Sequence, residues 1–324
     1  MAGSALLRGT AVLALAILAQ AAASAEDGLR LAVGGRGAFE SGIAEIGREQ
    51  GIFRRHGLDL EVSRVENSSE ALAAVTSGTA DVGLPIATLA TIEAFAKGAP
   101  VRVIGSAMIG ANEFWYVPAS SRIKTLKDAA GKSVAYASTG SASSLMVLAL
   151  QELLGVKIKI KPVPSGDPAA TLAQAMSGKV DVGYSVPPFA VAELEQGKIR
   201  IIARASDLPA LAKQTTRFIV ANSDALQRRP DTVRRFMQGY RETVDWLFSS
   251  DPQALAATAK WAGVPESVAR RMLGDLIRRE SLLPDPIAGL DAILADAATY
   301  TFINAPLTPE QIKTLIQPQV RRAD

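Results

Sequence analysis

The chain of 324 residues contains no cysteine, and its only histidine is His56. These absences exclude disulfide bonds, thiol catalysis, zinc sites of cysteine and histidine, and any serine–histidine–aspartate triad that does not use His56. The GxSxG, HExxH, P-loop and EF-hand motifs are also missing. The sequence therefore favours a binding protein over an enzyme, and we expect neither a metal ion nor a cofactor.

A strong excess of charge of either sign is missing too. Lysine and arginine number 35 against 32 aspartate and glutamate residues, which gives a net charge of +3, and the two signs are interspersed. A nucleic-acid-binding surface needs a basic cluster, so nucleic acid is not an expected partner. The length suits two domains of ordinary size, and 48% hydrophobic residues suffice for large cores.

The first 25 residues have the pattern of a signal peptide. Arg8 precedes an apolar run over residues 10–19, and Ala23-Ser24-Ala25 is a small-x-small cleavage motif. The run is shorter than the ~20 residues that span a bilayer, which argues against a membrane anchor. We expect cleavage before Glu26 and a periplasmic protein, without the lipid anchor that a cysteine would carry.

Short apolar segments alternate with helical segments through the first two thirds of the chain. This alternation predicts βαβ units with mainly parallel sheets, hence an α/β protein. From about residue 222 onward the pattern is helical, with proline in the first turn of several segments. The expected helices of this tail are 230–248, 252–261, 265–279, 287–302 and 309–316.

An internal repeat divides the α/β part. Residues 71–90 align without gaps on residues 171–190, with eight identities in twenty positions, and both contain Ser-Gly-x-x-Asp-Val-Gly. A common helix C-terminus before a strand is the simpler explanation, but two copies in the same βαβ context favour two homologous lobes. We expect one lobe of 26–113 plus 217–324 and a second of 114–216, joined by extended crossings near 112–118 and 215–221.

Two turns have features of ligand sites. Gly35 to Glu40 resembles the start of a dinucleotide fingerprint, but Glu40 replaces the third glycine and would repel a pyrophosphate, so close approach of a small ligand is favoured. Residues 136–144 join a strand to a helix and are rich in hydroxyl groups, which suits an anion; simple capping of the helix is the alternative. For His56 and Trp261 we expect structural roles.

Three segments in order resemble a known family: residues 42–62, the Asp-Val-Gly segment at 77–83, and residues 123–134. They are similar to the nitrate, sulfonate and taurine type of periplasmic solute-binding proteins of ABC importers, a group that includes binders of thiamine-pyrimidine precursors. The resemblance implies a two-lobed periplasmic binding protein fold with two crossover hinge strands and a helical C-terminal tail. It implies a monomer that closes on a small-molecule ligand and then engages an ABC permease in the inner membrane.

The same resemblance implies a ligand site at the loops that follow the strands. Arg36 is the cation in these loops that suits an acidic ligand, although a solvent-facing arginine is equally compatible with the turn. The implied binding residues are Arg36, Gly37, Phe39, Ser68, Ile86, Ala87, Thr88, Asn112, Ser138, Thr139, Gly140, Ser141, Ser165, Val186 and Pro187.

A small organic anion such as a sulfonate or taurine is the expected ligand. An aromatic or heterocyclic compound, such as a pyrimidine vitamin precursor, is the alternative, because Phe39, Trp115 and Tyr184 lie near the loops. Nitrate fits less well, since nitrate binders of this group resemble longer chains with histidine and lysine in the pocket. Pyrimidine-synthase enzymes resemble chains with a cysteine-rich segment, which this sequence lacks, and a signalling role would need an effector domain.

Overall fold

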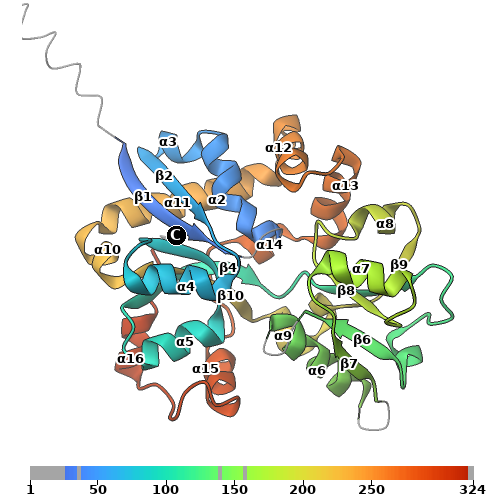
Figure 1. Cartoon of the computed structure of the whole chain (residues 1–324). Coiled ribbons are helices and arrows are strands. Elements are labelled where there is room, and N and C mark those ends of the chain that lie inside the picture. The colour runs from blue at the N-terminus through green and yellow to red at the C-terminus, as the bar shows by residue number, and fades with distance from the viewer. Residues whose placement is uncertain (1–25, 35–37, 138–140, 156–158, 320–324) are drawn as a thin grey trace, which may run out of the picture.

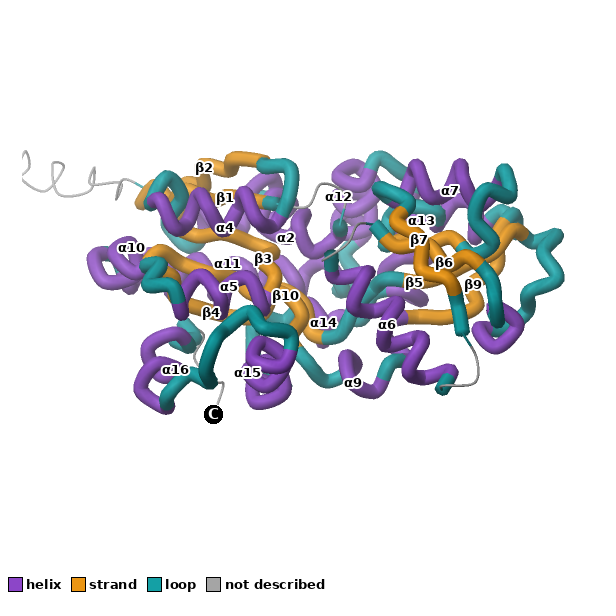
Figure 2. The backbone as a smooth tube through the Cα atoms, turned by 60° about the horizontal axis from the view of Figure 1, so that its bottom comes forward, coloured by secondary structure: helices purple, strands orange, loops and turns teal. Residues whose placement is uncertain are grey.

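The computed structural model describes residues 26–319 except 35–37, 138–140 and 156–158, so the predicted signal peptide lies outside the described part. Two groups of elements lie side by side, each built around β-strands with helices on both faces (Figures 1 and 2). The predicted α/β class is confirmed. Among the helices that the structure describes, none has both the length and the apolar character needed to cross a bilayer.

The first half is built on a sheet with strand order β2-β1-β3-β10-β4. β1 is parallel to β2 and β3, whereas β10 is antiparallel to β3 and β4. β10 follows the whole second half in the sequence, so the returning chain completes the first sheet. The strands are β1 Asp27–Val33, β2 Leu58–Arg64, β3 Val82–Ala87, β4 Val101–Ile109 and β10 Thr215–Asn222.

The second half repeats this plan with shorter strands. β6 is parallel to β7, and β5 lies between β8 and β9 and is antiparallel to both. A parallel bridge between Val134 and Val182 joins the two pieces, which gives the order β7-β6-β8-β5-β9. The strands are β5 Phe114–Pro118, β6 Ser133–Tyr136, β7 Lys161–Pro164, β8 Gly183–Ser185 and β9 Ile199–Arg204.

Side-chain alternation along the strands builds the cores. Leu29, Leu31 and Val33 of β1 enter the core on one face of the first sheet, and Ala32 enters the core on the other. A third core fills the second half. The covering helices are α2 Phe39–Glu49, α3 Ile52–Arg55, α4 Ser68–Ser77 and α5 Thr88–Ala96 in the first half, and α6 Ala142–Leu154, α7 Pro168–Met176, α8 Val191–Glu195 and α9 Pro209–Ala212 in the second.

The sequence repeat corresponds to a structural repeat. Its copies lie in different sheets: β3 begins within the first Asp-Val-Gly segment and β8 begins within the second. α4 and α7 start 100 residues apart, at Ser68 and Pro168. The aspartates of the two segments also make equivalent hydrogen bonds to a neighbouring strand. Asp81 accepts one from the backbone N–H of Arg30 (3.0 Å), and Asp181 accepts one from the backbone N–H of Ser133 (2.9 Å).

Most of the helical tail covers the first sheet. α11 packs on α2 and α3, where Phe236 stacks on Phe53 with ring centroids 5.5 Å apart, and α15 and α16 lie beside α5 and β4 on the opposite face. α13 instead contacts α8 of the second half. The tail helices are α10 Ser223–Arg228, α11 Pro230–Leu247, α12 Pro252–Ala262, α13 Glu266–Arg271, α14 Arg279–Leu282, α15 Leu290–Thr299 and α16 Pro309–Leu315.

One helix expected in the tail is broken. The segment 265–279 was predicted as continuous, but a π-helical turn, Met272–Leu276, follows α13, and Ile277 is extended. Ile277 is 2% exposed and belongs to the first core. The chain leaves the helix at this point, and the Ile277 side chain becomes buried in the first core. Helix propensity along the segment does not predict this, because the burial depends on tertiary contacts.

Candidate functional site

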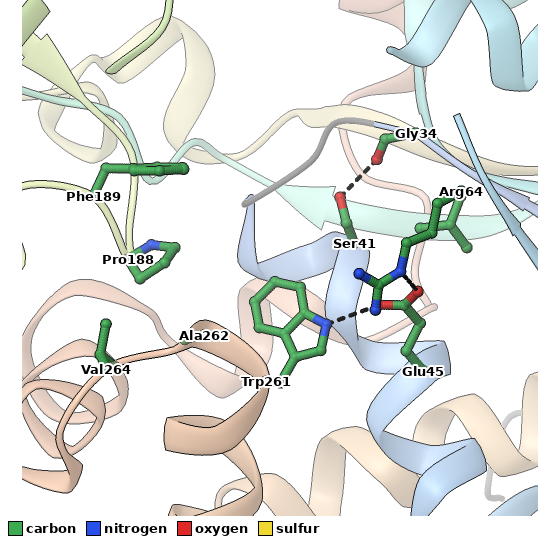
Figure 3. Close-up of a pocket in the computed structure, with 10 residues that line it drawn as sticks. Gly34, Ser41, Glu45, Arg64, Pro188, Phe189, Trp261, Ala262 and Val264 are labelled. Carbon is green, nitrogen blue, oxygen red and sulfur yellow. Dashed lines mark hydrogen bonds and ion pairs between the residues drawn. The ribbon is translucent and has the colours of Figure 1, made fainter. Parts of the chain in front are cut away.

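A cavity of about 260 Å³ lies between the two halves (Figure 3). The first half contributes the end of β1, the side of α2 that carries Ser41 and Glu45, and the end of β2, while the second half contributes the loop after β8. The end of α12 closes the remaining side. The lining residues are Val33, Gly34, Ser41, Glu45, Arg64, Pro188, Phe189, Trp261, Ala262 and Val264.

The site lies where general rules for α/β sheets place ligands. Val33 and Arg64 are the last residues of the parallel strands β1 and β2, and Pro188 and Phe189 follow β8. The carboxyl ends of parallel strands leave a crevice beyond the sheet, because the chain turns there into the covering helices. The cavity is thus formed by equivalent edges of the two sheets.

Glu45 forms hydrogen bonds to two other residues that line the cavity, Trp261 and Arg64. Trp261 donates a hydrogen bond from Nε1 to Glu45 Oε2 at 2.8 Å, and Arg64 donates from Nε to Glu45 Oε1 (Figure 3). The Glu45 side chain is only 4% exposed, whereas that of Arg64 is 60% exposed. A buried carboxylate needs such partners, and here it fixes both the indole and the guanidinium.

The indole of Trp261 is held on its other side by packing. It meets the ring of Phe39 edge-on, with centroids 5.8 Å apart and an angle of 80°. Gly42 makes room for it, since a Cβ at that position would come within 2.6 Å of Trp261 Cζ2. α2 therefore holds the Trp261 side chain in three ways: Gly42 leaves space for the indole, Phe39 packs against it, and Glu45 accepts its hydrogen bond.

The two chain crossings meet at a buried group of charges. Arg217 on β10 donates from Nη2 to Glu113 at 2.7 Å, and its Nε lies 3.1 Å from Glu40 at the start of α2. Burial raises the pKa of Glu40 and is opposed by the charge of Arg217. Burial acts to lower the pKa of Arg217, but Glu113 and Glu40 outweigh it and the pKa is raised. This group ties α2 to both crossings.

The predicted residues of the first half gather at the end of its sheet. Ser68 accepts a hydrogen bond at its hydroxyl from the backbone N–H of Ala87 (2.8 Å), so the loop before α4 meets the end of β3. Thr88 begins α5 directly afterwards. Phe39 and Ile86 have fully buried side chains, so they support the site from the core. The predicted residues Arg36 and Gly37 lie outside the described residues.

In the second half the described part of the hydroxyl-rich turn caps a helix. Ser141 accepts from the N–H of Ser144 (3.3 Å) as the N-cap of α6, and Ser143 accepts from the N–H of Ala137 (2.9 Å). Ser165 is buried and donates to the carbonyl of Val163 (3.1 Å). The predicted residues Ser138, Thr139 and Gly140 lie outside the described part.

The other predicted residues lie at the crossings and beside the cavity. Asn112 precedes β5, and its Nδ2 is a buried amide nitrogen without a hydrogen-bond partner among the described residues. Val186 and Pro187 directly precede the lining residues Pro188 and Phe189.

None of the residues that line the cavity was among the binding residues predicted from the sequence. Trp261 was expected to have only a packing role, but it also lines the cavity, while Trp115 and Tyr184 are buried in the second core and do not. Glu45 gave only a weak signal, because on α2 it lies one turn from the polar residues Ser41 and Arg48 and away from the apolar stripe. Arg64, at the end of a strand, had no comparable signal.

The family NMT1/THI5 like matches residues 43–254. This chain belongs to that family. A curated relative, 4-amino-5-hydroxymethyl-2-methylpyrimidine phosphate synthase THI12 of Saccharomyces cerevisiae, is 24% identical over 221 residues, which is 64% of this chain and 64% of the yeast protein. The match therefore spans less than two thirds of that relative. A binding protein of Brucella abortus is 22% identical over 227 residues, 69% of each chain.

Among solved structures, the family member described here is similar to the periplasmic aliphatic sulphonate binding protein SsuA of Escherichia coli. The TM-score is 0.70 at 21% identity, and the alignment covers 92% of this chain and 94% of the other. The fold is therefore the two-lobed fold of periplasmic binding proteins, as expected. The cavity lies between the lobes of this NMT1/THI5-like protein.

Proposed function

We propose that this protein is the periplasmic ligand-binding component of an ABC importer. It captures a small organic anion of sulfonate or taurine type between its lobes and delivers it to a permease, without chemical change of the ligand. The observation that carries this proposal is the cavity lined by both lobes, because such a site couples ligand binding to lobe closure.

The fold and the cavity walls support this choice. The sulphonate-binding protein of E. coli has the same fold at 21% identity. The described walls of the cavity combine the guanidinium group of Arg64 with apolar surface that includes Phe189 and Trp261. An organic anion has the matching parts, an acidic group and an apolar body.

The proposal includes a division of the chain into two lobes and a signal peptide. Residues 26–113 and 217–324 form the first lobe, 114–216 form the second, and the mature protein is a monomer that begins at Glu26. The separate sheets and cores of the two halves support this division. N-terminal sequencing of the exported protein tests the cleavage site, where a retained Met1 would contradict it.

Thermal unfolding with a panel of sulfonates, carboxylates and heterocycles tests the function. A ligand at a hundredfold excess over its dissociation constant stabilises the folded protein by about 2.7 kcal/mol. We expect a small sulfonate to raise the melting temperature and small-angle scattering to record a more compact protein. Failure of every small molecule in both measurements would contradict capture between the lobes.

An aromatic or heterocyclic ligand is the second candidate. Two aromatic side chains, Phe189 and Trp261, line the cavity from different lobes and can contact the faces or edges of a flat ring. The name of the yeast relative specifies a pyrimidine product. Binding of 4-amino-5-hydroxymethyl-2-methylpyrimidine, with no binding of sulfonates, would favour this candidate over the first.

A further inference from the structure

Among the described residues, three polar side chains, those of Ser41, Glu45 and Arg64, line the cavity, and two of them are hydrogen-bonded within the protein. The hydroxyl of Ser41 donates to the carbonyl of Gly34 at 2.8 Å. Both oxygens of Glu45 accept hydrogen bonds, one from Trp261 and one from Arg64, and the side chain is 4% exposed. The described walls of the cavity therefore present neither a free carboxylate nor the Ser41 hydroxyl to a ligand.

Arg64 is the third polar residue, and it has donors to spare. Its hydrogen bond to Glu45 uses Nε, and within the part of the chain described here no hydrogen bond or ion pair engages its Nη1 or Nη2. Arg64 lines the cavity (Figure 3), and its side chain is 60% exposed. Two parallel N–H groups of a guanidinium match the two oxygens of a carboxylate or sulfonate.

From this geometry we propose that Arg64 binds the acidic group of the ligand and that Glu45 is its positioning residue. The inference rests on the proposed function and assigns its specificity. Glu45 holds Nε on the protein side, so the plane of the guanidinium is fixed before the ligand arrives, and less side-chain freedom is lost on binding. Trp261 in turn holds Glu45 through its Nε1.

The rest of the wall defines the other end of the ligand. Val33, Val264, Pro188, Phe189 and Trp261 line the cavity with mainly apolar surface. A ligand with its acidic group on Arg64 therefore places its body against Trp261 of the tail and the Pro188–Phe189 loop of the second lobe. The expected class is an organic anion with an apolar or aromatic body, rather than a small inorganic ion.

Isothermal titration calorimetry of the full mature chain tests the assignment. The probes are benzenesulfonate, butanesulfonate, taurine and benzoate, with benzenesulfonamide as the uncharged match of benzenesulfonate. We expect the wild-type protein to bind at least one anion more tightly than the sulfonamide. Arg64→Gln should weaken that anion by roughly 10- to 100-fold, because hydrogen bonds to charged groups contribute strongly, and leave the sulfonamide unchanged.

Two further variants separate recognition from folding. Arg64→Gln leaves Glu45 with one partner fewer, whereas the double variant Glu45→Gln/Arg64→Gln removes both charges and leaves no unpaired buried carboxylate. The double variant should remain folded and still lose the anion. Arg48→Gln is the matched control, since Arg48 is exposed on α2 outside the cavity, and its affinity should equal that of the wild type.

The outcomes distinguish this inference from the function on which it rests. If the wild type binds an anion and Arg64→Gln binds it within about threefold, or if Thr139→Val and Ser141→Ala weaken it more, Arg64 is not the anchor although capture stands. If the wild type binds only uncharged compounds, the inference fails and the heterocyclic alternative remains. Absence of binding by every small molecule overturns both.

Discussion

β10 in the first half and β5 in the second occupy the same place in their sheets, each antiparallel to both neighbours, yet they carry different chemistry. β10 places Arg217 between the buried carboxylates of Glu40 and Glu113. β5 places Trp115 in an apolar core, where its Nε1 donates to the carbonyl of Ala135 at 3.0 Å. The first half secures this strand with charge, and the second half secures it with aromatic packing.

The same contrast extends to the cavity. The first half supplies the charged pair of the cavity, Glu45 and Arg64, and the second half supplies the apolar residues Pro188 and Phe189. A duplicated backbone plan therefore does not imply duplicated recognition. Under the proposed function, the charged group would select the ligand and the apolar loop would cover it, which would give the two halves different roles in one binding event.

The largest expected effect comes from removing the charge on β10. Arg217→Met should lower the free energy of unfolding by about 3–5 kcal/mol, because it leaves Glu40 and Glu113 as buried carboxylates without their cation. Urea unfolding followed by circular dichroism measures the change.

A variant in β5, the equivalent strand of the second half, sharpens this test. Trp115→Phe keeps an aromatic ring and removes one hydrogen bond, so we expect a loss of only about 1–2 kcal/mol. A variant with both Glu40→Gln and Arg217→Met should recover part of the loss in Arg217→Met. Equal effects of Arg217→Met and Trp115→Phe would mean that the charged group is no more important than the aromatic core.

The repeated aspartates give a smaller effect that differs between the halves. Asp81 is 4% exposed and accepts from the backbone and side chain of Arg30, with Arg229 2.8 Å away, whereas Asp181 is 42% exposed. Asp81→Asn should therefore cost about 1–3 kcal/mol, and Asp181→Asn no more than about 1 kcal/mol, because solvent screens the second site. Thermal and urea unfolding of both variants measure these costs.

The pH dependence of stability shows whether the loss in Asp81→Asn has an ionic cause. Burial acts to raise the pKa of Asp81, but hydrogen bonds from Arg30 and Arg229 outweigh it and lower the pKa. A lowered pKa means that the stabilisation is present above the unfolded-state value of about 4 and is lost as the pH falls through the lower folded-state value. The difference between wild type and Asp81→Asn should thus shrink below about pH 4. A difference independent of pH would contradict an ionic cause.

Local patterns predicted the repeat and the fold because both depend on residues close in sequence. The alternation of apolar segments and the two Ser-Gly-x-x-Asp-Val-Gly copies indicated α/β lobes, and the family resemblance placed Ser68 and Ala87 at one loop cluster, where they are in contact. The cavity was harder to predict, because it depends on contacts between distant segments. Trp261 reaches Glu45 across 216 residues, and no pattern near either residue specifies that pairing.

The smallest expected effect concerns the helix caps, and it should be equal in the two halves. Asn67 caps α4 by accepting from the N–H groups of Ser69 and Glu70, and Asp167, 100 residues later, caps α7 by accepting from the N–H of Ala170 at 2.7 Å. Asn67→Ala and Asp167→Ala should each lower the free energy of unfolding by about 1 kcal/mol, since each leaves a helix N-terminus without its acceptor. Asp167→Asn makes the second cap identical to the first and should change stability by less than about 0.5 kcal/mol, because asparagine and aspartate cap equally well. Urea unfolding of the three variants in parallel measures these values, and a cap whose removal costs nothing in one half alone would show that the repeat preserves the position of the residue but not its function.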